Sequence, residues 1–121
     1  MKPVFLCYPK CGTCRKAEKW LKANNIDYVY RPIKEENPGV DEISEWWKKS
    51  GLPLARFFNT SGLLYRENNM KDKVKTLSDN QLIEILSSDG LMVKRPVLLS
   101  GNKVLVGFNE EEWSNLLLNK I

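Results

Sequence analysis

The chain has 121 residues, a length typical of one domain, and 42% of them are hydrophobic, as in ordinary globular proteins. No stretch approaches the ~18 unbroken apolar residues of a membrane span, and the start "MKPVFLCYPKCG" has too short an apolar run for a signal peptide, so we expect a cytoplasmic protein that makes no membrane contact. The net charge of +4 is spread over basic residues interleaved with glutamates, which argues against direct nucleic-acid binding as the main activity.

The first predicted elements enclose all three cysteines of the chain. Residues 4–7 (VFLC) form a short apolar run bounded by prolines, which predicts a buried strand. From Gly12 onward, apolar residues recur at helical spacing until an asparagine pair that can end the helix. Cys11 and Cys14 therefore lie where the strand joins the helix, whereas Cys7 takes a position expected for a core side chain.

The middle of the chain predicts one strand and several helices. Residues 26–33 are rich in β-branched and aromatic types and predict a second strand. A helix is expected from residue 40 to Gly51, a typical C-cap. The segment after Gly51 carries apolar patches separated by turn residues, which predicts short helical turns joined by loops. Ser78 and Gln81 form a capping-box pattern that opens another helix.

The C-terminal part predicts a hairpin and a helix. Residues 97–100 and 103–108 are apolar runs separated by Gly-Asn, a typical hairpin turn. Asn109, with Glu112 three residues on, is expected to cap the last helix.

The predicted order is β-α-β, a helical insert, then β-β-α. This order is typical of the α/β thioredoxin-like fold, with a mixed four-stranded sheet and redox cysteines at the start of the first helix. We expect a single domain over residues 1–121, with the helical insertion at about 38–90.

The spacing of Cys11 and Cys14 permits a reversible disulfide at the start of a helix. The free amides of Gly12, Thr13 and Cys14, together with the helix dipole, favour the thiolate form of Cys11. The same helix N-terminus can bind an anion. Cys11 is therefore the predicted nucleophile and Cys14 the predicted resolving thiol.

Three other interpretations of the cysteines remain open. A permanent structural disulfide is disfavoured in the cytosol, where ordinary thiols stay reduced. A C-x-x-C motif can be half of a zinc site, but zinc prefers four ligands and this chain has three cysteines and no histidine. The cysteines can also be small buried residues, as free cysteine often is. We expect no metal and no bound cofactor.

Five segments in order resemble the arsenate reductase superfamily, in its branch near the Spx-type redox regulators: "YPKCGTCRKAEKWL", "SGLPLARFFNTSG", "KDKVKTLSDNQL", "LMVKRPVLL" and "VLVGFNEEEW". The resemblance covers nearly the whole chain. It implies a thioredoxin-like core with an extra helical subdomain and makes Cys11 the thiol that attacks an oxyanion. It also implies that Arg95 binds the anion and that Pro96 is a cis-proline facing the cysteines.

The resemblance also shows where this chain departs from the glutaredoxin-dependent arsenate reductases. Those proteins usually have a hydroxyl residue at the position of Cys14 and surround the anion with three arginines. Arg95 matches one of the three arginines. Arg56 lies near a second but is one residue off, and Asn59 stands at an arginine position.

These observations predict a thiol-disulfide oxidoreductase that cycles Cys11 and Cys14 to reduce an oxyanion such as arsenate, or a disulfide. Thioredoxin, or glutathione with glutaredoxin, would be the reductant. The alternative is an Spx-like transcriptional regulator, in which the same disulfide is a switch that changes contact with RNA polymerase. An enzyme consumes reductant in proportion to substrate, whereas a switch is oxidised once.

Overall fold

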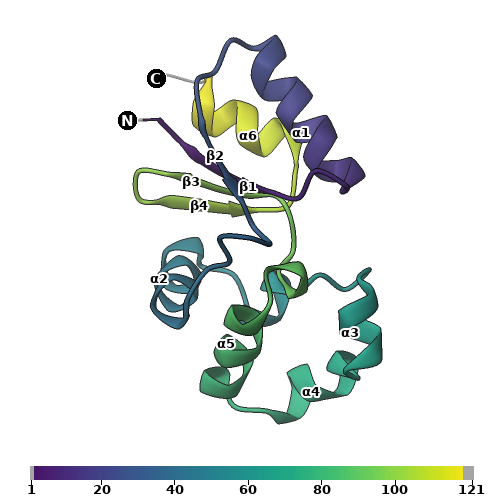
Figure 1. Ribbon diagram of the computed structural model, residues 1–121. Helices are drawn as coiled ribbons and strands as arrows, with labels where there is room; N and C mark the ends of the chain where they lie inside the picture. The colour runs from purple at the N-terminus through teal and green to yellow at the C-terminus, as the bar shows by residue number, and fades with distance from the viewer. Residues whose placement is uncertain (1, 119–121) are drawn as a thin grey trace.

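The computed structural model describes residues 2–118. A mixed four-stranded sheet lies at its centre (Figure 1). The strands are β1 (Val4–Cys7), β2 (Val29–Pro32), β3 (Val97–Ser100) and β4 (Lys103–Val106), and their order in the sheet is β2-β1-β3-β4. β1 pairs parallel with β2 and antiparallel with β3, which pairs antiparallel with β4. This is the predicted thioredoxin-like α/β arrangement.

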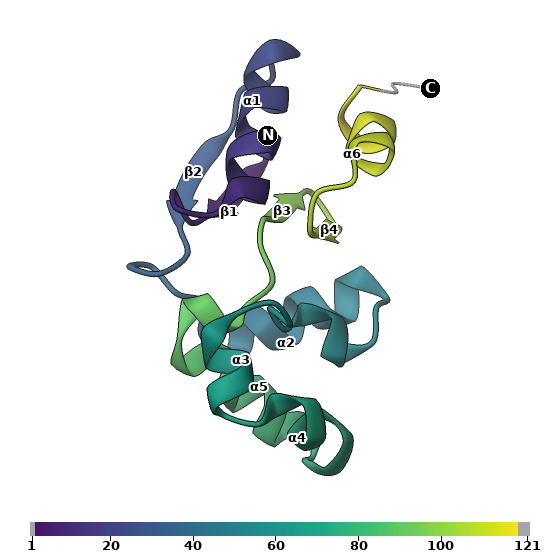
Figure 2. The same cartoon turned by 90° about the vertical axis from the view of Figure 1, so that its right-hand side faces the viewer.

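Helices cover both faces of this sheet. α1 (Gly12–Ala23) and α6 (Glu110–Leu117) lie on one face. The other face carries α2 (Val40–Ser50), α3 (Leu63–Glu67), α4 (Met70–Thr76) and α5 (Asp79–Ser88) (Figures 1 and 2). None of the helices in the described part of the chain is long and apolar enough to cross a membrane. The 3₁₀ helices are η1 (Leu54–Phe57) and η2 (Gly90–Met92).

The alternation of side chains along β1 divides the core into two layers, because successive residues of a strand point to opposite faces. Phe5 and Cys7 pack toward α1 and α6, whereas Leu6 packs toward the helices on the other face. The layer next to α1 and α6 contains Cys14, Ala17, Leu21, Leu98 and Trp113, all fully buried. Cys7 is 2% exposed, which confirms the core position predicted for it.

Several helix ends are formed by the residues that the sequence indicates. The Ser78 hydroxyl accepts a hydrogen bond from the Gln81 amide at 3.2 Å, and the Gln81 side chain accepts one from the Ser78 amide at 3.0 Å. Gly51 ends α2 in the left-handed conformation, with φ +69°. The Asn109 side chain accepts from the Glu112 amide at 2.9 Å and caps α6. These local signals confirm the predicted ends.

Two strands are shorter than predicted. β2 covers only Val29–Pro32 of the predicted 26–33 because the Ile26 amide still donates to the Leu21 carbonyl, at 3.0 Å, and keeps the chain against the end of α1. β4 ends before the predicted residue 108 because Gly107 turns with φ +83° and donates to the Pro96 carbonyl at 2.8 Å.

An ion pair links β2 to the first turn of α2. The Arg31 guanidinium donates to both Glu42 oxygens, at 2.7 and 2.9 Å, and Glu42 also accepts from the Gly39 amide at 3.1 Å. The hydrogen bond from Arg31 lowers the pKa of Glu42 below its ordinary value. Since the Glu42 side chain is 42% exposed, water screens much of this interaction.

The pair predicts a small acid-dependent loss of stability. A carboxyl group with a lowered folded pKa stabilises the fold above its unfolded pKa of about 4.3, and this stabilisation is lost as pH falls through the folded value. We expect Glu42→Gln to lower the melting temperature modestly at pH 7 and to flatten the decline in acid. Melting curves between pH 7 and 3 test this, with Glu45→Gln as the surface control. Identical pH profiles for wild type and Glu42→Gln would contradict it.

Candidate active site

Cys11 is the N-cap residue of α1, at the turn that follows β1. Its amide donates to the Tyr8 carbonyl at 2.9 Å, and its own carbonyl accepts from the Arg15 amide at 3.1 Å. Its side chain makes no capping hydrogen bond and is partly exposed. The first amides of a helix have no partner within the helix. The thiol therefore lies at a partly positive helix end and remains accessible.

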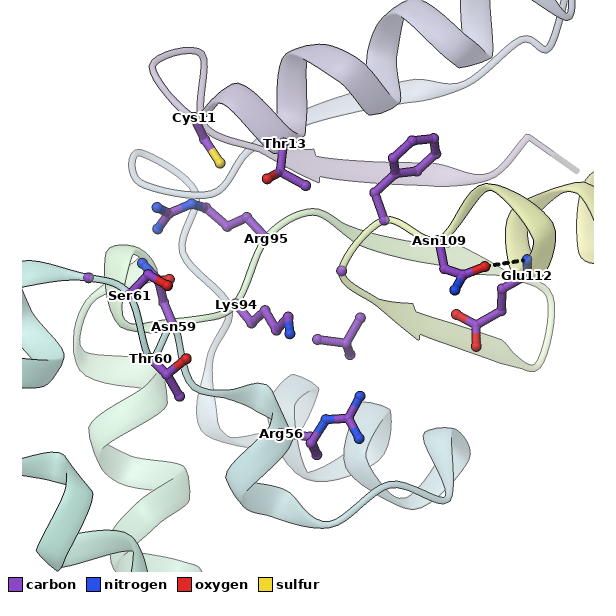
Figure 3. Close-up of a pocket in the computed structure, with 14 residues that line it drawn as sticks. Cys11, Thr13, Arg56, Asn59, Thr60, Ser61, Lys94, Arg95, Asn109 and Glu112 are labelled. Atoms are coloured by element: carbon purple, nitrogen blue, oxygen red, sulfur yellow. Dashed lines mark hydrogen bonds between the residues drawn. The ribbon is translucent and has the colours of Figure 1, made fainter.

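An open pocket of about 630 Å³ lies beside Cys11, between the start of α1 and the helices on the opposite face of the sheet (Figure 3). In Figure 3 the Cys11 thiol points toward the Arg95 side chain. The lining residues come from four segments of the chain: Cys11 and Thr13; Arg56 and 59–62; Lys94 and Arg95; and 106–109 with Glu112.

Backbone pairing between distant segments builds the middle of this pocket. Phe58 and Val93 form an antiparallel bridge. On either side of the bridge, the Asn59 amide donates to the Met92 carbonyl at 2.9 Å, and the Lys94 amide donates to the Phe57 carbonyl at 2.8 Å. The loop that follows Asn59 is thereby held against the segment that enters β3.

Two contacts hold the guanidinium of Arg95 in place. Nη1 donates to the Leu91 carbonyl at 3.1 Å, and the guanidinium lies 5.3 Å from the centre of the Tyr8 ring. Nε is buried and has no hydrogen-bond partner within residues 2–118. A guanidinium has five N–H donors in a planar fork that suits oxyanions. Arg95 therefore offers donors to an anion bound near Cys11. The peptide bond from Arg95 to Pro96 is cis, as the resemblance implies.

Cys14 lies behind Cys11, inside the protein. It is fully buried, and its sulfur accepts a hydrogen bond from the Tyr8 amide at 3.4 Å. A hydrogen bond with Cys7 and burial both raise the pKa of Cys14 above its ordinary value, and the Cys14 side chain also interacts with Cys11. Cys14 is thus shielded from solutes but placed to react with Cys11.

The structure brings most of the predicted site residues together. Cys11, Thr13, Arg56 and Arg95 line the pocket. Gly12 places its amide in the first turn of α1, and its side-chain position faces open space. Asn59, noted in the sequence as standing at an arginine position, lies in the loop opposite Arg95 (Figure 3).

The sequence did not identify five other lining residues with polar side chains: Thr60, Ser61, Lys94, Asn109 and Glu112. Asn109 and Glu112 were predicted to cap the last helix, and they do so. The cap pattern gives no sign that the same two residues also line the pocket. Lys94 stands directly before Arg95 in the sequence, and this position is the one signal that could have identified it. Within residues 2–118, no group of three or more His, Cys, Asp or Glu residues is arranged to hold a metal ion.

The difference in exposure predicts a large difference in thiol reactivity. We expect native protein to incorporate one equivalent of iodoacetamide at Cys11, while Cys7 and Cys14 react only after unfolding, because both are at most 2% exposed. Mass spectrometry of timed digests measures this order. Fast native labelling of Cys14 would contradict the assignment of Cys11 as the accessible thiol.

A family model described as the ArsC family matches residues 6–116. This range includes β3, β4, Cys11 and Cys14 at the start of α1, and the residues that line the pocket. The chain belongs to the ArsC family. Among curated relatives, it is 46% identical to the uncharacterized protein YusI of Bacillus subtilis, over 93% of this chain and 96% of YusI. It is also 29% identical to the global transcriptional regulator Spx 2 of Bacillus anthracis, over 94% of this chain and 86% of that protein.

Solved structures of ArsC-related proteins share this fold. A crystal structure from Bacteroides fragilis, described as related to the ArsC family, has 47% sequence identity and a TM-score of 0.92, and the match covers 96% of this chain and 99% of that one. The arsenate reductase from Vibrio cholerae has 23% identity and a TM-score of 0.80, over 100% of this chain and 98% of that one. The second likeness concerns the fold alone.

Proposed function

We propose that this ArsC-family protein is a thiol-disulfide oxidoreductase with Cys11 as nucleophile and Cys14 as resolving thiol. One observation carries the proposal: Cys11 is the partly exposed thiol beside the Arg95 guanidinium, and a second, fully buried thiol lies directly behind it. An accessible thiol with an internal partner is the arrangement that two-step disulfide chemistry requires.

A disulfide substrate would be reduced in two steps. The Cys11 thiolate attacks one substrate sulfur, the substrate S–S bond breaks, and the first thiolate leaves. Cys14 then loses its proton and attacks the Cys11 sulfur, which releases the second thiolate and leaves a Cys11–Cys14 disulfide. The two substrate sulfurs gain two electrons and two protons, and the two cysteines lose them. Thioredoxin, or glutathione with glutaredoxin, would reverse the oxidation.

An oxyanion would follow the same route. Cys11 would replace one hydroxyl group of arsenate, which leaves as water once protonated, to form an S–As bond. When Cys14 attacks the Cys11 sulfur, the electron pair of the S–As bond passes to arsenic and reduces it from As(V) to As(III). Arg95 and the first amides of α1 are suited to bind the anion during attack, because both direct N–H donors to the pocket end near Cys11.

The volume of the pocket supports an organic substrate as well. A space of about 630 Å³ falls in the range of small-molecule sites and is larger than one oxyanion needs. Its wall carries positive side chains, from Arg56, Lys94 and Arg95, and one carboxylate, from Glu112. A small disulfide with charged substituents therefore fits the chemistry of the wall.

The anion-binding part of the proposal predicts a specific effect of Arg95→Lys. Lysine keeps the charge but loses the fork of donors, so we expect arsenate or sulfate to protect Cys11 from alkylation in wild type and at least about tenfold less strongly in Arg95→Lys. Arg56→Lys is the matched control and should retain most of the protection. Equal protection in all three proteins would contradict the role of Arg95 and leave the start of α1 as the anion binder.

A second candidate function is a redox-controlled regulator, which the likeness to Spx 2 over 94% of this chain favours. In that case the Cys11–Cys14 disulfide would change binding to RNA polymerase. A coupled assay with thioredoxin or glutaredoxin separates the two functions. Reductant consumption that continues with added arsenate or disulfide supports the enzyme, whereas one equivalent per chain, with RNA polymerase retained by only one redox form, supports the regulator.

A further inference from the structure

The three cysteines form a row of interacting thiols that runs from the pocket into the core. Cys11 lies at the pocket wall, Cys14 is fully buried, and Cys7 is 2% exposed at the end of β1. Cys7 and Cys14 are buried in the same core cluster, and Cys11 packs against it. The Cys14 sulfur accepts a hydrogen bond at 3.4 Å from the amide of Tyr8, which directly follows Cys7 in the chain. All three cysteines are free thiols. Cys14 therefore has two possible disulfide partners, and the proposed function uses only one of them.

The surroundings of Cys7 are unusual for an inert core residue. Its thiol interacts with Cys14 and with Tyr30, whose strand pairs with β1. Burial and the neighbouring Cys7 raise the pKa of Tyr30 to about 12, so the Tyr30 hydroxyl stays protonated and can donate to sulfur. The hydrogen bond with Cys14 lowers the pKa of Cys7. Once Cys14 is part of a disulfide it has no proton to donate, so the Tyr30 hydroxyl is the donor that remains beside Cys7 and favours its thiolate, the form that attacks a disulfide.

We propose that Cys7 is a third redox thiol, which takes over the disulfide from Cys11 and carries it into the core as a Cys7–Cys14 bridge. The inference rests on the proposed function, which supplies the Cys11–Cys14 disulfide and the oxidising substrate. Cys7 attacks the Cys14 sulfur, the Cys7–Cys14 bond forms as the Cys11–Cys14 bond breaks, and the proton of Cys7 passes to the Cys11 thiolate. This exchange moves the disulfide without any net gain or loss of electrons.

The exchange has two consequences for the oxidised protein. Cys11 becomes a free thiol again at the pocket, although the protein remains oxidised. The new disulfide joins two residues that are each at most 2% exposed, so a reductant reaches it only after Cys11 has attacked Cys14 and reversed the exchange. The row of thiols thus protects the oxidised state from direct reduction.

Trypsin can separate the two disulfides because it cuts after Lys10 and Arg15. Cys7 falls on the peptide that ends at Lys10, and Cys11 and Cys14 share the peptide 11–15. The protein is oxidised with hydroxyethyl disulfide, freed of reagent, labelled natively with iodoacetamide, and then unfolded and labelled with N-ethylmaleimide. We expect a cross-link between the two peptides, with the native label on Cys11. An internal disulfide in 11–15, with Cys7 labelled only after unfolding, would overturn the proposal.

Two variants separate this inference from the proposed function. Cys7→Ala should give the internal disulfide in 11–15 and no native label, and Cys11→Ser should form the cross-link at least about tenfold more slowly, since the oxidant must then reach buried thiols. If Cys11→Ser forms the cross-link as fast as wild type, the Cys7–Cys14 disulfide does not arise from a Cys11–Cys14 disulfide, and the proposal fails. If Cys7→Ala forms no disulfide, the proposed dithiol function fails as well, and with it the basis of this inference.

Discussion

Replacing Cys11 with serine is expected to lower kcat/KM for arsenate or small disulfides by about 10³-fold or more, because a serine hydroxyl is not ionised at neutral pH and does not replace the attacking sulfur. The same substitution should leave the fold intact. Cys11 makes no side-chain cap on α1, and serine is among the preferred N-cap residues. We therefore expect an unchanged or slightly raised melting temperature together with the loss of turnover.

The coupled assay with thioredoxin or glutaredoxin measures this loss, and thermal unfolding serves as the control. Arg56→Lys is compared in parallel, to show how much a charge-preserving change at the pocket wall affects the same rate. A Cys11→Ser protein that keeps more than about a tenth of wild-type turnover would place the nucleophile elsewhere.

Gly90→Ala is expected to cause the largest loss of stability among the substitutions considered. A Cβ at Gly90 would lie 1.8 Å from the Ile33 carbonyl oxygen, a backbone atom that cannot turn away as a flexible side chain would. Either η2 or the chain after β2 must move, and both pack in the buried core. We expect a loss of at least about 3 kcal/mol in the free energy of unfolding.

Gly12→Ala is the matched control for this experiment. A Cβ at Gly12 meets nothing within 4 Å, and alanine is favoured over glycine inside a helix. Urea unfolding should show Gly12→Ala at or slightly above the stability of wild type, well separated from Gly90→Ala. Equal stabilities of the two variants would mean that the close approach of Gly90 to Ile33 is relieved at little cost.

Elements with local signals were predicted well from the sequence. The strand over Val4–Cys7, the start of α1 at Gly12 and the cap at Ser78 each depend on neighbouring residues, and the structure places them as predicted. The short helical turns expected after Gly51 are η1, α3 and α4. The lengths of β2 and β4 were overestimated, because strand ends depend on where the partner strand begins and on tertiary hydrogen bonds such as that from Gly107 to Pro96.

The pocket could be predicted only in part, since non-local pairing assembles it. The cysteine motif marks one wall, and the family resemblance adds Arg95. Lys94 and the loop after Asn59 meet this wall because residues 57–59 pair with residues 92–94, more than thirty positions away in the sequence. Neither hydrophobic period nor cap pattern encodes that pairing. The contact of Cys7 with Cys14 likewise depends on how α1 packs against β1.

Trapping the covalent intermediate on Cys11 tests the proposed roles of Cys11 and Cys14. Without the resolving thiol, the mixed disulfide formed in the first step has no internal route to release. Cys14→Ser treated with hydroxyethyl disulfide should therefore accumulate one stable adduct on Cys11 in the intact mass and peptide map, whereas wild type should carry no adduct and be lighter by two hydrogens. An adduct on Cys7, or one that persists equally in wild type and Cys14→Ser, would contradict the assignment of Cys11 as nucleophile and Cys14 as resolving thiol.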